Sequence, residues 1–383
     1  PPAVGWLLRR TTFWLPSSIV MSSRPTPCRS ICRLAVLSSL GVLSSPQAPG
    51  AGFFLPNQST EATMRGNAWV ATADSPAAVY YNPAGLVQIE GNAVEAGIFT
   101  VRLKHDVEIA GTTYEAEREW QAVPHLFYAQ PINDKFTWGL GVFAPFGLGK
   151  EYGQDTPFRT VTTNAEIVYL RASAVLAYEI SDTLSVGAGI GLDYVDGTIE
   201  QGIGIFPTDE LSFEGDGLAW TATAGILWRP HEQHSFGAAI RSGSQFTVEG
   251  DVSSKPGGVP GFPDGDARLD LDTPMSVAAG YAFKVNDRLT IEANVEWVDW
   301  DMFNDLTLSG SGMPQDAVLP FEWESTFIYE IGMSYKVNEI YTFHLGYDYN
   351  EGAQPDKYYN PAVGDADFQY VTVGVNREEG PLT

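Results

Sequence analysis

The segment 183-TLSVGAGIGLDYV-195 alternates between two kinds of side chain. Apolar residues stand at every second position from Leu184 to Tyr194, and Thr, Ser, Gly and Asp fill the positions between them. A helix would scatter these residues around its circumference, whereas a strand sorts them onto two faces. The segment is therefore predicted to be a strand with one apolar face and one small or polar face.

The same alternation recurs along most of the chain from about residue 93 onward. It is clear in 289-LTIEANVEW-297, 327-FIYEIGMSYKV-337 and 341-YTFHLGYDYN-350. Runs of about ten residues are longer than common strands and match tilted membrane-spanning strands. Coarse counting gives twelve strands, at 93–104, 118–131, 135–144, 165–180, 183–197, 217–229, 233–249, 268–284, 288–300, 323–337, 340–350 and 367–376.

The first fifty residues have a different character. They contain five arginines and no acidic residue. From Met21, a basic stretch leads to the apolar segment 34-LAVLSSLGVLSS-45 and then to small residues. This pattern predicts a secretory signal that starts at Met21 and is cleaved before Ala51, with a short buried helix as the alternative. Its removal would take away both cysteines, so no disulfide is expected in the exported chain.

Aromatic residues and turn lengths bear on the environment of the strands. Pairs such as Trp220 with Trp228 and Trp297 with Trp300 stand near the ends of apolar faces, as in interfacial girdles. Short turns rich in Asn and Asp alternate with long segments, expected to be loops at 198–216, 250–267 and 302–322. A secreted sandwich or propeller is the alternative, but strand length, export signal, aromatic ends and absent cysteines favour a transmembrane antiparallel β-barrel.

Composition and motifs exclude several functions. A formal net charge of −25 does not suit nucleic-acid binding, which needs basic patches. The sequence contains no apolar run of about 18 residues, so it predicts no membrane-spanning helix. No nucleophile-elbow or phosphate-loop pattern occurs, so we predict no enzyme, no cofactor and no metal site. His231 and His234 are expected to lie in a solvated turn, and an outer-membrane lipase or protease stays the least favoured alternative.

One part of the sequence resembles a known family. The segment 51-AGFFLPNQSTEATMRGNAWVATADSPAAVYYNPAGL-86 is similar to the mature N-terminus of long-chain fatty acid transporters of the FadL/TodX type. The features in register are Ala51-Gly52-Phe53, Arg65-Gly66-Asn67-Ala68, Ala73-Asp74 and Asn82-Pro83-Ala84-Gly85-Leu86. The segments 144-APFGL-148, 291-IEANVEWVDWDMF-303 and 323–352 also resemble that family, so the likeness covers nearly all of the exported chain.

The resemblance implies an architecture. Members of that family form a fourteen-stranded barrel with an N-terminal hatch inside it, and about twelve strands are visible here. We therefore expect an upstream segment and signal in residues 1–50, a hatch in 51–92 and a barrel in 93–383. We expect the barrel either to lack its last hairpin through C-terminal truncation or to close with twelve strands.

The resemblance also implies a function. It suggests passive uptake of long-chain fatty acids or other hydrophobic compounds across the outer membrane of a Gram-negative bacterium, by a monomer embedded in lipid. The ligand would be captured in an external apolar groove, pass to a deeper pocket and leave beside a kinked strand after the hatch moves. A general porin or a structural barrel is the alternative.

Candidate site residues follow from the same resemblance. The implied hatch and gate residues are Ala51, Gly52, Phe53, Arg65, Asp74, Asn82, Pro83 and Gly85. The implied ligand groove or wall kink consists of Pro145, Phe146, Gly147 and Leu148, for which an ordinary strand end is the other interpretation.

Four basic residues are expected inside the barrel. Arg65 is expected to bond a carboxylate of the wall. Lys104, Arg171 and Arg241 suit either a ligand carboxylate or ion pairs within the barrel, and the ion pairs are the commoner case.

Overall fold

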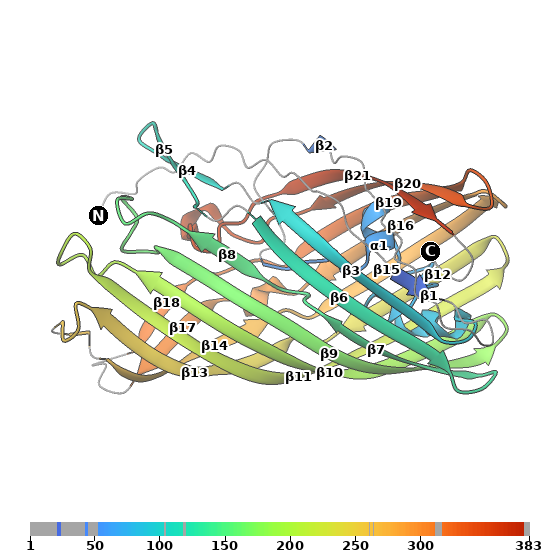
Figure 1. Ribbon diagram of the computed structural model, residues 1–383, viewed down its shortest axis with the longest axis horizontal. Helices are drawn as coiled ribbons and strands as arrows, with labels where there is room; N and C mark the ends of the chain where they lie inside the picture. Colours follow the sequence, from blue (N-terminus) through green and yellow to red (C-terminus); the bar gives the residue numbers. More distant parts are fainter. Residues whose placement is uncertain are drawn as a thin grey trace.

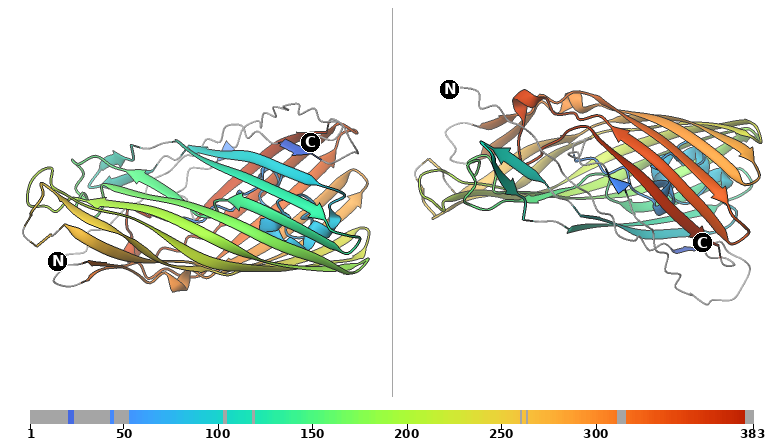
Figure 2. Two further views of the ribbon diagram at one scale, coloured as in Figure 1. Left: turned by 60° about the horizontal axis from the view of Figure 1, so that its bottom comes forward. Right: turned by 90° about the horizontal axis from the view of Figure 1, so that it is seen from above.

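The computed structural model describes residues 21–23, 43–44, 53–102, 105–117, 120–259, 261–262, 264–310 and 316–378. Nearly all of the predicted signal and the candidate residues Ala51, Gly52 and Lys104 lie outside them. The main feature is one antiparallel sheet that curves into a barrel wall (Figures 1 and 2). Among the described residues, no helix is long and apolar enough to cross a membrane.

The wall consists of long strands, each paired with its neighbours in an antiparallel register. In sheet order they are β21 (Phe368–Arg377), β20 (Tyr341–Asn350), β19 (Thr326–Lys336), β16 (Leu289–Val298), β15 (Ser276–Asn286), β12 (His234–Arg241), β11 (Glu210–His231), β10 (Leu184–Gln201), β9 (Asn164–Ser181), β7 (Phe136–Phe143), β6 (Trp120–Pro131) and β3 (Ala93–Arg102). The outer edges of β3 and β21 carry β1 (Met21–Ser23) and β2 (Leu43–Ser44).

Further strands extend the wall at the end opposite the short turns. They are β8 (Leu148–Glu151), β13 (Ser244–Lys255), β14 (Gly265–Thr273), β17 (Asp305–Gly310) and β18 (Ala317–Pro320). A separate hairpin there is formed by β4 (Asp106–Ile109) and β5 (Thr112–Glu115). Two single-turn helices follow β16 and β20 at this end, η2 (Trp300–Met302) and η3 (Asp356–Tyr358).

Each of the twelve predicted strands coincides with an observed strand or with two successive ones. The predicted loops are wrong in extent. The strands β10 and β11 stay paired as far as Gln201 and Leu211, so most of 198–216 is strand. Likewise 250–267 and 302–322 contain parts of β13, β14, β17 and β18. Polar composition suggested loops, but pairing of backbone groups continues regardless of side-chain polarity.

The two faces of the wall have the polarity of a membrane barrel. Large apolar side chains point outward, for example Ile190 at 59% exposure and Trp220 at 69%. Charged residues such as Arg171 and Asp193 are buried inside. Trp300, predicted to belong to an aromatic girdle, is instead wholly buried. The chain leaves the wall after Val298 and η2 turns this ring inward, which period-two reasoning does not anticipate.

Residues 53–92, called here the inner segment, lie inside the wall towards the end with the short turns (Figures 1 and 2). They contain α1 (Thr60–Met64), α2 (Ala78–Tyr81) and the 3-10 helix η1 (Pro83–Gln88). Asn82 caps η1 by accepting a bond from the Ala84 amide, and Pro83 occupies the first helical position. The boundaries predicted for the hatch and the barrel stay predictions.

The inner segment packs closely against glycines of the wall. Seven wall glycines face it, and a β-carbon at any of them would overlap an atom of the inner segment. We call this set the glycine girdle: Gly139, Gly187, Gly225, Gly237, Gly332, Gly346 and Gly374. The absence of side chains lets the backbone of the inner segment approach the wall closely at Gly187, Gly237, Gly332 and Gly346. At the other three glycines it makes room for the side chains of Val79, Asn82 and Met64.

Candidate ligand site and gate

The start of the inner segment pairs with a break in the wall. Strand β7 ends at Phe143 and β8 begins at Leu148, and residues 144–147 turn inward between them. The Leu55 amide donates to the Pro145 carbonyl at 2.8 Å, and the Gly147 amide donates to the Phe53 carbonyl at 3.0 Å. Proline cannot donate to a strand ladder, which makes this a natural place for the wall strand to leave its partners.

The Gln58 side chain strengthens the same junction. Its amide group donates to the Ala144 carbonyl at 2.8 Å, and its oxygen accepts from the Ala144 amide at 3.2 Å. Four wall-kink or gate candidates, Phe53, Pro145, Phe146 and Gly147, are thus brought together at the break. A contact between segments so distant in sequence leaves no local signal in either of them.

Aromatic rings fill the barrel beside this junction. Phe53 stands among them, with its ring centroid 5.7 Å from Phe146, 5.1 Å from Trp300 and 6.1 Å from Trp323. The set called here the aromatic cluster is buried and consists of Phe53, Phe54, Phe146, Tyr169, Phe246, Trp300, Phe303, Phe321 and Trp323. Withdrawal of Phe53 would leave a space walled by aromatic carbon, the lining expected for an apolar ligand.

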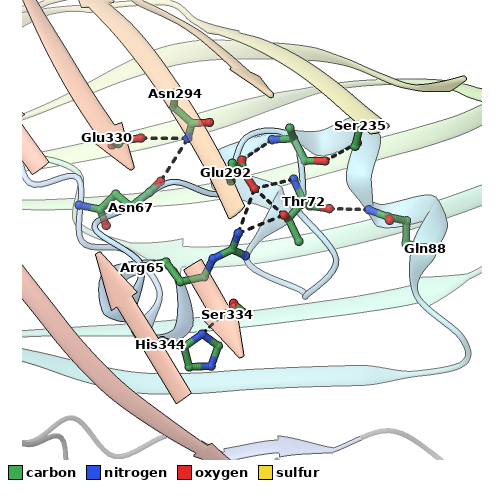
Figure 3. A network of polar contacts seen from close by, with 11 residues as sticks. Arg65, Asn67, Thr72, Gln88, Ser235, Glu292, Asn294, Glu330, Ser334 and His344 are labelled. Atoms are coloured by element: carbon green, nitrogen blue, oxygen red, sulfur yellow. Dashed lines mark hydrogen bonds and ion pairs between the residues drawn. The ribbon is translucent and has the colours of Figure 1, made fainter. Parts of the chain in front are cut away.

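An ion pair anchors the inner segment directly after α1 (Figure 3). Arg65 donates to Glu292 of β16 at 3.2 Å, and both side chains are almost wholly buried. Glu292 also accepts from the backbone amides of Ala71 at 2.7 Å and Thr72 at 3.1 Å, and from the Thr72 hydroxyl. The predicted bond between Arg65 and a wall carboxylate is confirmed.

A second group of polar contacts lies beside this pair. Asn67 donates to Asp348 of β20 at 3.3 Å. The Asn294 amide donates to Glu330 at 2.9 Å and to the Asn67 carbonyl at 3.4 Å (Figure 3). Asn67 has a positive φ of 59°, which asparagine tolerates better than most residues. The inner segment is therefore held to β16 and β20 by hydrogen bonds between buried groups.

The remaining gate candidates have mainly structural contacts. Asn82 donates to the carbonyl oxygens of Val70 at 2.8 Å and Ile226 of β11 at 3.0 Å. At Gly85 a β-carbon would overlap the Ala73 carbonyl, so only glycine fits. Asp74 is exposed at the rim of a polar cavity of about 420 Å³ that Glu61 also lines. These residues lie apart from the aromatic cluster.

Glu61 of α1 has an unusual environment in this cavity. Burial, reinforced by the negative charge of Asp74, raises the pKa of the Glu61 carboxyl to about 8, although Arg65 acts in the opposite direction. Sequence reasoning did not single out this residue, because a glutamate at a helix start is most often a solvated one.

Arg171 and Arg241 form ion pairs within the barrel, as predicted. Arg171 donates to Asp193 from two nitrogens, at 2.6 and 2.8 Å. Arg241 donates to Glu296 at 2.8 Å. His234 lies with its ring nitrogen 2.8 Å from the Tyr281 hydroxyl, and the described residues hold no group of three or more metal-type ligands.

The loop at 202–209 is held together by Asp209, a role that the sequence did not reveal. The carboxylate of Asp209 accepts from four consecutive amides, those of residues 203 to 206, and Arg159 donates to it at 2.9 Å. Burial opposes ionisation, but these donors outweigh it and hold the pKa of Asp209 well below its usual range. The loop presents Ile205 and Phe206 to the outside, each about half exposed.

The fold and this site define a class of protein: a β-barrel of the bacterial outer membrane whose interior is filled by the chain's own N-terminal part. Residues 41–377 match the sequence profile of the family described as outer membrane protein transport protein (OMPP1/FadL/TodX). The chain belongs to this family, whose members are transporters. Its predicted fold class and its location in the outer membrane of a Gram-negative bacterium are confirmed.

Individual relatives are distant in sequence. The long-chain fatty acid transport protein of Escherichia coli strain K12 is 24% identical, over 87% of this chain and 85% of that protein. A FadL homologue of Pseudomonas aeruginosa has a TM-score of 0.76 at 21% identity, covering 86% of this chain and 88% of the other. The toluene transporter TodX of Pseudomonas putida has a TM-score of 0.68 at 20% identity, covering 87% and 90%.

Proposed function

We propose that this protein carries long-chain fatty acids or other hydrophobic small molecules passively across the outer membrane. It acts as a monomer surrounded by outer-membrane lipid, without cofactor or catalytic step. The single observation that supports this most is the junction of residues 53–55 with the inward break at 144–147, beside the aromatic cluster. The relatives named above supply the substrate classes, fatty acids and toluene.

The gate in this proposal is the short stretch from Phe53 to Gln58. It is held to the break by backbone bonds and the Gln58 side chain, and it precedes the more firmly anchored Arg65. Its withdrawal frees both the space of the Phe53 ring and the polar backbone edge at 144–147. An apolar ligand then leaves sideways through the wall and avoids the polar route past the inner segment.

The test is deletion of residues 51–58, which ends before α1. Uptake of a radiolabelled long-chain fatty acid and of labelled toluene by cells carrying this variant is compared with wild type. We expect the barrel to assemble, judged by heat-modifiable migration in gels, and the uptake of at least one ligand to change by tenfold or more. Unchanged uptake of both ligands contradicts the gate.

Planar bilayer recordings separate this function from that of a general porin. A barrel filled by its inner segment conducts little, whereas porins leave a water channel. Large steady conductance by the wild-type protein contradicts the proposal. Lipid hydrolysis by purified protein would contradict the absence of a catalytic step.

A further inference from the structure

The Gln58 side chain bonds to both backbone groups of a single wall residue. Its carboxamide nitrogen donates to the Ala144 carbonyl at 2.8 Å, and its oxygen accepts from the Ala144 amide at 3.2 Å. The same nitrogen donates to the Leu55 carbonyl at 2.6 Å, and Gln58 is 1% exposed. One planar group of the inner segment therefore satisfies a donor and an acceptor of the wall together.

Ala144 is the first residue of the break in the wall. Strand β7 ends at Phe143, which pairs with Arg171 of β9, so neither backbone group of Ala144 belongs to the strand ladder. Ala144 is half-buried, and Phe146 of the aromatic cluster follows two residues later. Withdrawal of residues 53–58 would leave this amide and carbonyl side by side without Gln58, which is costly where water is scarce. A ligand group that replaces Gln58 there removes that cost.

The carboxamide of Gln58 shows which ligand group fits. A group in its place must accept a bond from the Ala144 amide and donate one to the Ala144 carbonyl. A primary carboxamide and an un-ionised carboxylic acid both present one acceptor and one donor in a plane. An ionised carboxylate only accepts, and it would face the Ala144 carbonyl oxygen. A fatty acid therefore fits this position once its head group has taken up a proton.

The charged and titratable groups around Gln58 agree with an uncharged occupant. Its backbone amide donates to the Tyr81 hydroxyl at 3.1 Å, and the next residue, Ser59, donates to Glu95 at 2.6 Å. Arg171, across from the end of β7, is paired with Asp193. Among these groups the one cation already has its counter-charge, so they do not favour an anion beside Ala144.

We propose that the backbone amide and carbonyl of Ala144 form a head-group site for an un-ionised carboxyl or carboxamide group, which the Gln58 side chain occupies while the gate is closed. The head group of a ligand displaces Gln58, and its apolar chain takes the place of Phe53 beside the aromatic cluster. Binding and opening are coupled, because ligand and gate compete for the same two backbone groups. This inference rests on the proposed transport function and adds the trigger that releases the gate; a long-chain fatty acid is a ligand of this kind.

The test uses the full chain in lipid nanodiscs and three labelled probes: tetradecanoic acid, tetradecanamide and tetradecane. Binding is measured by equilibrium dialysis, after subtraction of protein-free nanodiscs. We expect tetradecanamide to bind at least about tenfold more tightly than tetradecane, which has no head group. The affinity for tetradecanoic acid relative to tetradecanamide should rise as the pH is lowered from 8 to 5, because only the acid takes up a proton.

Two variants separate the head-group site from the gate. Ala144→Pro removes the N–H that Gln58 and the ligand both use, so the preference for tetradecanamide over tetradecane should fall to below about threefold. Gln58→Leu weakens only the closed gate, so all probes should bind about fivefold to tenfold more tightly with the preference kept.

Gln88→Leu is the matched control for Gln58→Leu. Gln88 also belongs to the inner segment and makes similar bonds, donating to the Thr72 carbonyl at 2.8 Å and accepting from Arg229 at 3.0 Å, but it does not bond to the break. Its replacement should leave the affinities for all three probes unchanged.

The variant Gln58→Glu places a carboxyl group at Ala144 within the chain itself. At pH 5 the un-ionised group keeps both bonds, so tetradecanamide should bind as it does to the wild type. At pH 8 the ionised group loses one bond and faces the carbonyl, so the affinity should approach that of Gln58→Leu. The wild type, measured at both pH values, corrects for other groups such as Glu61. Equal affinities of Gln58→Glu and wild type at pH 8 overturn the requirement for an un-ionised group.

The remaining outcomes separate the possible failures. Tetradecane binding as tight as that of tetradecanamide overturns the head-group site, and so does a full preference for tetradecanamide in folded Ala144→Pro. The wild-type comparison stands even when that variant does not fold. Equal effects of Gln88→Leu and Gln58→Leu overturn the competition at Ala144. Failure of all three probes to bind the wild-type protein instead overturns the proposed transport function.

Discussion

At the scale of single residues, the anchoring of the inner segment is concentrated in Arg65 and Glu292. They lie 227 positions apart in sequence and are bonded at 3.2 Å, with both side chains almost wholly buried. Such a pair contributes little net stability compared with an apolar replacement of both partners, but the loss of one partner leaves a buried, uncompensated charge. Its effect is therefore to impose a position on the inner segment.

The variant Glu292→Ala should lower the free energy of unfolding by about 3–5 kcal/mol, because Arg65 stays buried without a partner. The loss of unfolding free energy is measured by urea unfolding of the protein in lipid vesicles, with the folded fraction monitored by its migration in gels. The double variant Arg65→Met, Glu292→Leu should recover only part of it, because the Ala71 and Thr72 amides still lack their acceptor. The pair Lys255 and Glu210, whose lysine side chain is 69% exposed, is the control, where Lys255→Gln should cost under about 1 kcal/mol. Equal costs for the two single variants would contradict this assignment.

What could be read from the sequence differs among residues. The match to a family placed Arg65 opposite a carboxylate, but it could not say which of the many acidic residues, because the partner is set by strand register far along the chain. Phe53 and Phe146 were named separately, while their contact emerged only from the fold. Glu61 and Asp209 gave no signal, since their properties arise from burial and not from a motif.

At the scale of elements, helix α1 carries a carboxyl group, that of Glu61, whose ionisation affects stability near neutral pH. Glu61 lines the polar cavity together with Asp74 and Glu95, and with the cations Arg65, Lys284, Arg288 and Lys336. Its carboxyl has a folded-state pKa of about 8, above the ordinary value of 4.5. A raised pKa in the folded state contributes stability that is complete below the ordinary value and is lost as the pH rises through about 8.

We therefore expect α1 to be held more firmly at pH 6 than at pH 9. The thermal midpoint of the wild-type protein should be lower at pH 9 than at pH 6. The variant Glu61→Gln should lose most of this difference, because its side chain cannot ionise. Heat-modifiable gel migration at both pH values checks the prediction, and an unchanged pH dependence in Glu61→Gln would show that another group is responsible.

The strands were the easiest elements to predict and the inner segment was the hardest. Alternation with period two survives in every wall strand because lipid and lumen impose opposite polarities on successive side chains. The hairpin of β4 and β5 and the inward turn at Trp300 were missed, because they depend on packing over the barrel mouth. Short helices such as α2 have too few turns for a periodic signal.

At the scale of the whole molecule, the glycine girdle determines how the inner segment fits its wall. Gly332 faces the backbone of Arg65, and Gly346 faces the junction of Arg65 and Gly66. Close contact with the wall on several sides sterically prevents most of the inner segment from sliding. The short stretch from Phe53 to Gln58, which the girdle does not contact, remains the part best placed to move.

The variant Gly332→Ala should therefore destabilise the protein by about 1–3 kcal/mol, the usual cost of overpacking. Gly197→Ala in β10 is the matched control, since its new β-carbon would lie 4.0 Å from its nearest neighbour, the backbone oxygen of Glu166. Urea unfolding in lipid vesicles distinguishes them. Equal free energies of unfolding for Gly332→Ala and Gly197→Ala would mean that the inner segment shifts freely to accommodate the new methyl group.

The glycine girdle also bears on the order of assembly. Met64 and Arg65, near the start of the inner segment, fit against β19, β20 and β21, whereas Pro83 fits against β10. Residues 64–66 thus wait for the strands made last, and Gly66 meets Thr372 only across 306 positions. Contacts this distant in sequence slow folding. We therefore expect the inner segment to take its final place only after β19, β20 and β21 have joined the wall.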